Sequence, residues 1–176
     1  MTRRFSEATR EALDAQGWRR TELPGGLTLA GLHAAGVPFK GDKASGRPGL
    51  AEHPLAAGEM AYRPGLMPGT ANVTREALGA LLDELRPRLP TGVEPAIGSA
   101  AAYGWLLAEH QRRLGEWLLA RVFTWTADDL GGTPLAIGVF GGGLLVSPLP
   151  EGRGAGVGLL PLLIPADSNP VDRVKS

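Results

Sequence analysis

The sequence LGGTPLAIGVFGGGLLVSPLP occupies positions 130–150 and contains no charged side chain. Its apolar runs, Leu135–Phe140 and Leu144–Ser147, are separated by three glycines, which is the pattern of two antiparallel strands joined by a tight turn. Just upstream, Val122–Thr126 is built from β-branched and aromatic residues, and a turn is expected at Asp128–Gly132. These features predict an antiparallel β-meander in the C-terminal part of the chain.

A fourth strand is predicted at Leu159–Ile164. Pro161 would confine this strand to the edge of the meander, because proline has no N–H to donate to a neighbouring strand. The uninterrupted apolar runs differ from the alternation of a sheet with one wet face, so both faces of the meander are expected to be covered. The sequence leaves three covers open: the N-terminal half of the chain, a second copy of the chain, or a ligand.

Three segments upstream of the meander have helical periodicity, namely Phe5–Gln16, Thr74–Arg86 and Ser99–Arg121. Each has a serine or threonine near its start that can cap a helix. Trp18–Leu23 is expected to be extended, while Leu27–Ala35 fits either a helix or a strand. The predicted fold class is therefore α+β, with N-terminal and central helices packed on a C-terminal antiparallel β-meander of three to four strands.

The length of 176 residues predicts one domain, which we place at residues 1–166, followed by a polar tail at 167–176. Prolines and glycines are spread through residues 36–69 at a density that excludes a long helix. We expect an irregular Gly/Pro-rich loop there. Loops of this length inside a compact domain are usually functional.

The composition excludes several classes of protein. There is no cysteine, so disulfides, thiolate nucleophiles and cysteine-based zinc sites are absent. The N-terminal residues carry two arginines but no apolar segment behind them, and no apolar run reaches the ~20 residues that a membrane helix needs. We expect a cytoplasmic protein that is neither secreted nor embedded in a membrane.

No catalytic or cofactor motif is complete. Residues 36–43 resemble a phosphate-binding loop, but Asp42 stands where the lysine belongs. The glycines of residues 152–158 lack the spacing of a dinucleotide-binding loop. His33, His53 and His110 are too far apart for a local metal pair, so we expect neither a metal nor a cofactor. His110 falls on the apolar stripe of the long predicted helix, where it needs a hydrogen-bond partner.

The 36–69 loop holds the candidate ligand-binding and catalytic residues. Basic residues interleaved with aromatic ones can bind a phosphorylated small molecule or a single nucleic-acid strand. His53 and Glu59 are the candidate acid–base pair, if they lie within hydrogen-bond reach of each other or of a substrate. The candidate ligand-binding residues are Lys40, Lys43, Arg47, Tyr62 and Arg63.

The leading functional hypothesis is a non-catalytic binding or protein-interaction module that self-associates as a homodimer. The interface would be the uncharged sheet, or Trp105 and Leu119, which are large apolar residues on the charged side of the predicted helix. The alternative is an enzyme or binder for a small anionic, phosphorylated molecule at the 36–69 loop. Nucleic-acid binding through that loop is a second alternative, against which the balance of 18 basic and 18 acidic residues argues. Whether the chain catalyses a reaction stays open.

Overall fold

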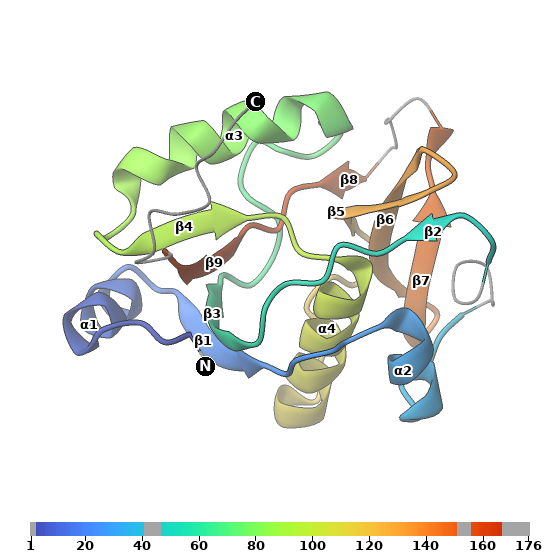
Figure 1. Ribbon diagram of the computed structural model, residues 1–176, viewed down its shortest axis with the longest axis horizontal. Helices are drawn as coiled ribbons and strands as arrows, with labels where there is room; N and C mark the ends of the chain where they lie inside the picture. Colours follow the sequence, from blue (N-terminus) through green and yellow to red (C-terminus); the bar gives the residue numbers. More distant parts are fainter. Residues whose placement is uncertain (1–2, 41–46, 151–155, 167–176) are drawn as a thin grey trace.

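The computed structural model describes residues 3–40, 47–150 and 156–166, and it shows an α+β chain with four α-helices and two β-sheets in that part (Figure 1). The first sheet has the strand order β1-β3-β9-β4, and the second has the order β2-β5-β6-β7, with β8 paired to β5. The strands are β1 (Arg19–Leu23), β2 (Leu50–Ala51), β3 (Gly58–Tyr62), β4 (Val93–Ala96), β5 (Phe123–Leu130), β6 (Thr133–Phe140), β7 (Gly143–Pro148), β8 (Val157–Gly158) and β9 (Leu162–Pro165). The helices are α1 (Glu7–Ala15), α2 (Leu29–Ala34), α3 (Leu78–Leu85) and α4 (Ala100–Leu114). The predicted α+β class is confirmed.

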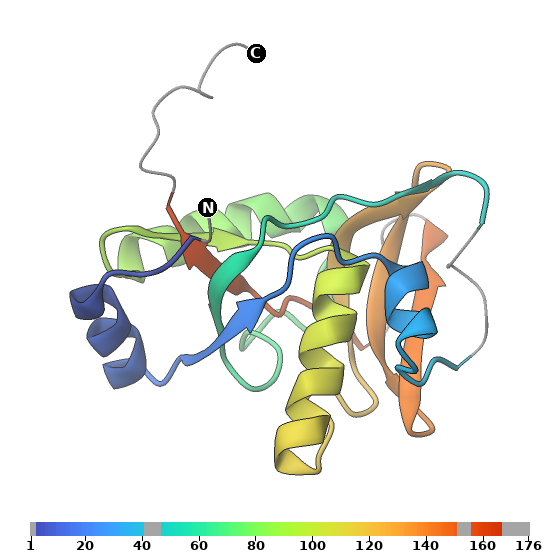
Figure 2. The same ribbon diagram turned by 60° about the horizontal axis from the view of Figure 1, so that its bottom comes forward.

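Helix α4 lies between the two sheets and contacts strands of both (Figures 1 and 2). Ser99 caps it by accepting a hydrogen bond from the Ala102 N–H at 3.1 Å, as the sequence predicts. In the middle of the helix, the fully buried Tyr103 donates its hydroxyl to the Leu160 carbonyl at 2.6 Å. This bond ties α4 to the segment that crosses from the second sheet to the first.

The helix ends earlier than the sequence indicates. Gly115 follows Leu114 with a φ of 76°, a left-handed conformation that glycine adopts without steric cost and that closes the helix. The chain then turns back, and Leu119 enters the core with no exposed surface. The predicted helical continuation to Arg121 is therefore wrong, because the glycine ends the helix.

The meander forms three of its predicted strands, β5, β6 and β7. Both faces of β6 are covered by the chain itself: Ile137 packs in the core around α4, while Ala136 packs on the opposite side with Leu78. The middle of β6 is therefore covered without a second copy of the chain, while Phe140 at its end is 61% exposed. The predicted fourth strand, however, belongs elsewhere: β9 lies inside the first sheet between β3 and β4. It begins at Leu162, one residue after Pro161, so the proline does not confine it to an edge.

The first sheet takes its second strand from a segment that was expected to be irregular. Within residues 36–69, β3 is central and buried at all five positions, and β2 pairs with β5. The pattern missed β3 because it begins with Gly58 and Glu59, neither of which favours a strand. The expected polar tail at 167–176 lies outside the described residues.

Asp128 was expected in a turn but lies in β5 with 1% of its surface exposed. Its carboxylate accepts hydrogen bonds from the Ala100 N–H at 2.7 Å and the His53 N–H at 2.6 Å. Burial raises the pKa of Asp128, and the two N–H groups oppose that rise. The side chain thus joins the start of α4 to the segment that leads into β3.

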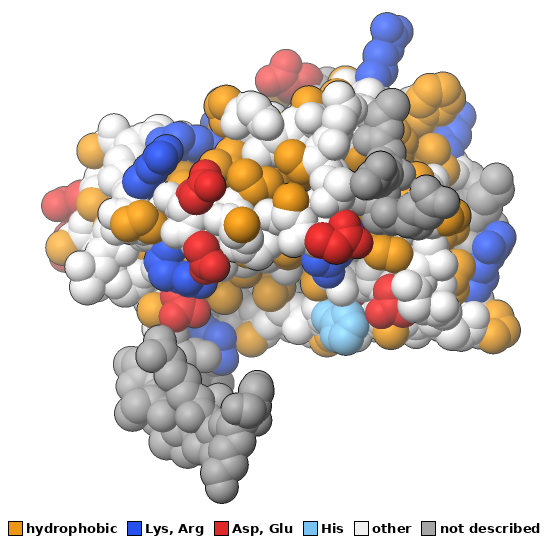
Figure 3. Space-filling view, turned by 90° about the horizontal axis from the view of Figure 1, so that it is seen from above, with side chains coloured by type: hydrophobic (Ala, Val, Ile, Leu, Met, Phe, Trp, Pro, Cys, Tyr) orange, Lys and Arg blue, Asp and Glu red, His pale blue; other side chains and the backbone are white. Residues whose placement is uncertain are grey.

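In the described part of the chain, no helix has both the length and the apolar character needed to cross a membrane. Acidic and basic side chains are interspersed on the face shown in Figure 3, without a continuous basic patch there. This distribution agrees with the balanced charge of the sequence.

Candidate functional site

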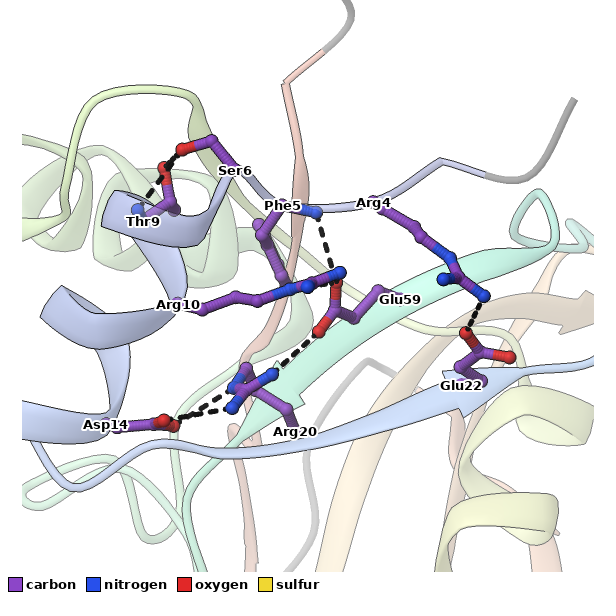
Figure 4. A network of polar contacts seen from close by, with 9 residues as sticks. All are labelled: Arg4, Phe5, Ser6, Thr9, Arg10, Asp14, Arg20, Glu22 and Glu59. Atoms are coloured by element: carbon purple, nitrogen blue, oxygen red, sulfur yellow. Dashed lines mark hydrogen bonds and ion pairs between the residues drawn. The ribbon is translucent and has the colours of Figure 1, made fainter.

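Glu59 holds the first sheet to the N-terminal helix through a network of ion pairs (Figure 4). Its side chain is 7% exposed, and its Oε2 accepts hydrogen bonds from Arg10 Nη2 at 2.9 Å and from the Phe5 N–H at 3.1 Å. Its Oε1 accepts one from Arg20 Nη1 at 3.0 Å. Arg20 also pairs with Asp14 of α1 at 2.9 Å. The carboxylate therefore binds two cations and one amide from three separate segments.

This network does not support Glu59 as an acid–base catalyst. Burial raises the pKa of Glu59, but the hydrogen bonds from Arg10 and Arg20 outweigh it and hold the pKa below its usual value. The Glu59 carboxylate is thus ionised near neutral pH, and both of its oxygens already accept hydrogen bonds. His53, its predicted partner, is exposed, and among the described residues no hydrogen bond or ion pair joins it to Glu59. The structure does not bring the predicted catalytic pair together.

A pocket of about 180 Å³ lies on the other face of the first sheet, between β1 and α4. We call it the β1–α4 pocket. Its walls combine three arginines with a buried histidine, a buried tyrosine and the apolar side chains of α4. The lining residues are Arg19, Arg20, Thr21, Tyr62, Leu106, Glu109, His110, Arg113 and Leu114.

His110 and Tyr62 form the floor of this pocket. The Tyr62 hydroxyl and His110 Nδ1 are 3.2 Å apart, and their rings meet edge to face with centroids 6.1 Å apart. The predicted hydrogen-bond partner for His110 is therefore confirmed. Burial, together with the positive charge of Arg19, lowers the pKa of His110, while burial raises the pKa of Tyr62. Both side chains are neutral near pH 7.

The arginines of the pocket differ in how far their charges are already neutralised. Arg113 pairs with Glu109 one helical turn away. Arg20 is held by Asp14 and Glu59. Arg19 is exposed and forms no ion pair with a carboxylate in the described part of the chain. Its guanidinium is therefore the charge at this pocket that is open to a ligand.

Thr21 adds an unsatisfied polar atom to the same wall. Its Oγ1 is shielded from solvent and, within the described residues, has no hydrogen-bond partner. A buried hydroxyl without a partner loses its hydrogen bonds to water without replacing them, so such groups are uncommon in folded proteins. A ligand atom in the pocket can supply the missing bond if the Thr21 side chain turns toward it, because the Oγ1 is closed to solvent in this structure.

A second, more open hollow of about 420 Å³ adjoins the pocket and shares Arg20, Thr21 and Arg113 with it. We call it the edge hollow. Glu22 and Glu59 complete its lining. Successive strand residues point to opposite faces of a sheet, so a hollow lined by Arg20, Thr21 and Glu22 together runs along the edge of β1.

The low pKa of His110 predicts how stability changes with pH. Because the folded-state pKa lies below the 6.5 of a free histidine, the unfolded chain binds more protons between the two values. This contribution to the free energy of unfolding is complete above pH 6.5 and is lost as the pH falls through the folded-state pKa. We expect urea unfolding of the wild type to weaken from about pH 7.5 to about pH 5.5 more than that of His110→Gln. Parallel pH profiles of the two proteins would contradict the assignment.

The predicted ligand-binding residues are dispersed, apart from Tyr62 in the pocket. Lys40 lies at the β6–β7 turn, where its N–H donates to the Leu144 carbonyl at 2.7 Å, and Arg47 is exposed ahead of β2. Arg63 stacks over the Trp18 ring at 4.5 Å from the ring centroid. Lys43 falls outside the described residues. The described residues of the 36–69 segment therefore do not form the expected cluster around one ligand.

The two predicted interface residues, Leu119 and Trp105, differ in how far they are buried. Leu119 is fully buried, so it offers no surface for a partner, and this prediction is wrong because α4 ends before it. Trp105 is half-buried and packs against the core around α4. The residues that sequence reasoning missed are Arg19, Thr21 and Arg113, which are ordinary surface positions in the sequence and meet only when β1 lies against α4.

Among the described residues, no group of three histidine, aspartate or glutamate side chains is placed to hold a metal ion. No protein-family model, curated protein or solved structure matches this chain. The β1–α4 pocket is thus the feature from which a function can be inferred.

Proposed function

We propose that the chain is a binding module that takes an anionic group in the β1–α4 pocket. The observation that carries the proposal is the Arg19 guanidinium, which lines the pocket, is exposed and forms no ion pair with a carboxylate in the described part of the chain. A carboxylate or phosphate oxygen bound there would accept hydrogen bonds from Arg19 and, once its side chain turns toward the ligand, from the Thr21 hydroxyl, which has no partner within the described residues. Charge-assisted bonds of this kind are about twice as strong as neutral ones.

The size of the pocket supports a small anionic group rather than a large organic ligand. Pockets that enclose drug-sized molecules measure roughly 300–1,000 Å³. The β1–α4 pocket, at about 180 Å³, accommodates a phosphate, a short carboxylate or a single side chain. His110 and Tyr62 are bonded to each other at its floor, which supports binding rather than acid–base catalysis.

Self-association is not needed to explain the features that first pointed to it. The middle of β6 is covered on both faces by the chain itself, and Leu119 is buried. The binding proposal therefore rests on the pocket and not on an apolar surface. The described residues of the 36–69 segment form no cluster that would support nucleic-acid binding.

A nuclear magnetic resonance titration tests the proposal. Sodium phosphate, with ionic strength held constant by sodium chloride, should shift amide signals of β1 and α4 selectively. Arg19→Gln should weaken binding by about tenfold, equivalent to ~1.4 kcal/mol, because it removes the unpaired cation. Arg88→Gln, at an exposed arginine beyond α3, is the matched control and should titrate as the wild type does. Equal shifts with sodium chloride alone would overturn the proposal.

A further inference from the structure

The edge of β1 is open. Within the residues that the structure describes, β1 pairs only with β3, so one side of its main chain faces away from the sheet. Among the described residues, none of the main-chain N–H groups of Arg19–Leu23 donates to a segment outside the sheet. An edge strand of this kind presents a row of N–H and C=O groups that can pair with another extended chain.

The outer edge of the second sheet, at β7, is partly covered by another segment of the chain. Residues Pro38–Lys40 run beside β7, where the Lys40 N–H donates to the Leu144 carbonyl at 2.7 Å. The Leu144 N–H in turn donates to the Pro38 carbonyl at 2.8 Å. The chain therefore covers part of this edge with its own main chain and leaves β1 without such a cover.

The edge hollow lies where an added strand would run. It adjoins β1 along Arg20, Thr21 and Glu22, and it opens into the β1–α4 pocket through the residues that the two share. The larger hollow has room for a segment of main chain, and the smaller pocket has room for one side chain. A strand lying beside β1 would direct alternate side chains toward α4, because side chains alternate between the faces of a sheet.

Resting on the proposed function, we infer that the site binds an extended peptide segment that adds to the edge of β1 and inserts an aspartate or glutamate side chain into the β1–α4 pocket. Charge complementarity identifies the partner as acidic. Of the three arginines that line the pocket, Arg113 pairs with Glu109 and Arg20 pairs with Asp14 and Glu59, so Arg19 is the one without an ion pair in the described part of the chain. Charged side chains on an edge strand normally disfavour pairing with apolar strands. The arginines here should therefore disfavour apolar, aggregation-prone strands and favour an acidic one.

The two parts of the interaction have separate roles. Main-chain hydrogen bonds to β1 give affinity that does not depend on the peptide sequence, whereas the pocket selects the side chain. The inserted carboxylate meets the Arg19 guanidinium, which forms no ion pair with a carboxylate in the described part of the chain, and lies beside Thr21 in the same wall. A free anion fills only the pocket, so a peptide should bind more tightly than phosphate does.

Fluorescence anisotropy with a labelled acidic peptide, Thr-Val-Glu-Val-Glu-Val-Thr, tests the inference on the full chain. Replacing both glutamates by glutamine should weaken binding at least about tenfold, and so should Arg19→Gln in the protein. Methylating alternate main-chain nitrogens of the peptide removes N–H donors without changing its charge. One of the two alternating methylation patterns should weaken binding about tenfold or more, since only one set of N–H groups faces β1. Arg88→Gln should bind as the wild type does.

The outcomes separate this inference from the anion-binding proposal. If phosphate shifts the β1 and α4 signals but neither methylated peptide is weakened, anion binding stands and strand addition is overturned. If the peptide binds through its main chain but the glutamine version binds equally well, the acidic partner is overturned. If neither phosphate nor the peptide binds, both proposals fail. Protection of the β1 amides from hydrogen exchange on peptide binding gives an independent readout, which anion binding alone would not produce.

Discussion

Gly138→Ala should lower the free energy of unfolding by about 3 kcal/mol. This is a large fraction of the total free energy of unfolding of a protein domain, which is ~5–15 kcal/mol. A Cβ atom at this position would lie 2.2 Å from the Val122 carbonyl oxygen and 2.9 Å from Cδ1 of Phe123. Phe123 is the partner of Gly138 across β5 and β6, and its ring covers the space that a side chain would need. The main-chain oxygen cannot rotate away, so the strand itself has to move.

Thermal and urea unfolding check this expectation, and the chain offers a matched control. Gly79 lies in α3, is exposed, and has no atom within 4 Å of an added Cβ. Gly79→Ala should stabilise the protein by about 0.5–1 kcal/mol, because alanine has less conformational freedom to lose in a helix. A melting temperature of Gly138→Ala equal to that of the wild type would show that β5 and β6 are not packed as described.

The meander was predictable because its sequence pattern is local. Residues 130–150 contain both the apolar runs and the glycine turn, so neighbouring residues specify the hairpin of β6 and β7. Ser99 and Gly115 also mark the ends of α4 through local sequence. The apolar residues after Gly115 continue the helical periodicity, and they led to a predicted helix that extends past the glycine. Leu119 was misplaced for that reason.

The first sheet was not predictable in the same way, because distant segments form it. β3 reaches its place only together with the other strands of the sheet, and its buried Glu59 is stabilised because Arg10 and Arg20 lie beside it. β3 shows no alternation of buried and exposed residues, because all five of its residues are buried. Asp128 illustrates the same limit, because its role depends on two N–H groups from other segments.

The candidate site depends even more on tertiary contacts. Its residues come from β1, β3 and α4, and each is unremarkable in its own segment. His110 gave the one usable signal, because a histidine on an apolar stripe needs a partner, but the identity of that partner, Tyr62, could not be derived. Arg19 and Thr21 are parts of a short polar strand that carries no motif.

Glu59→Ala should lower the free energy of unfolding by about 3 kcal/mol. The substitution removes the carboxylate that accepts hydrogen bonds from Arg10, Arg20 and the Phe5 N–H. Glu59→Gln keeps the shape but not the charge, and it should cost roughly 2 kcal/mol. The control is Glu22→Gln, which breaks the exposed ion pair with Arg4 and should cost less than about 1 kcal/mol. Urea unfolding at neutral pH measures all three. Similar losses for Glu22→Gln and Glu59→Gln would mean that the buried network contributes no more than a surface pair.

Acid titration and ligand binding make the role of Glu59 more specific. The folded-state pKa of Glu59 is below the 4.5 of a free glutamate, so its contribution is complete above pH 4.5 and is lost as the pH falls through the folded-state value. The stability difference between the wild type and Glu59→Gln should therefore shrink in acid. At neutral pH the same variant removes one of the two carboxylates that pair with Arg20, which lines both the β1–α4 pocket and the edge hollow, and leaves it paired with Asp14. Glu59→Gln should accordingly bind phosphate more tightly while it unfolds more easily, because the carboxylate that stabilises the fold also competes with the ligand for Arg20.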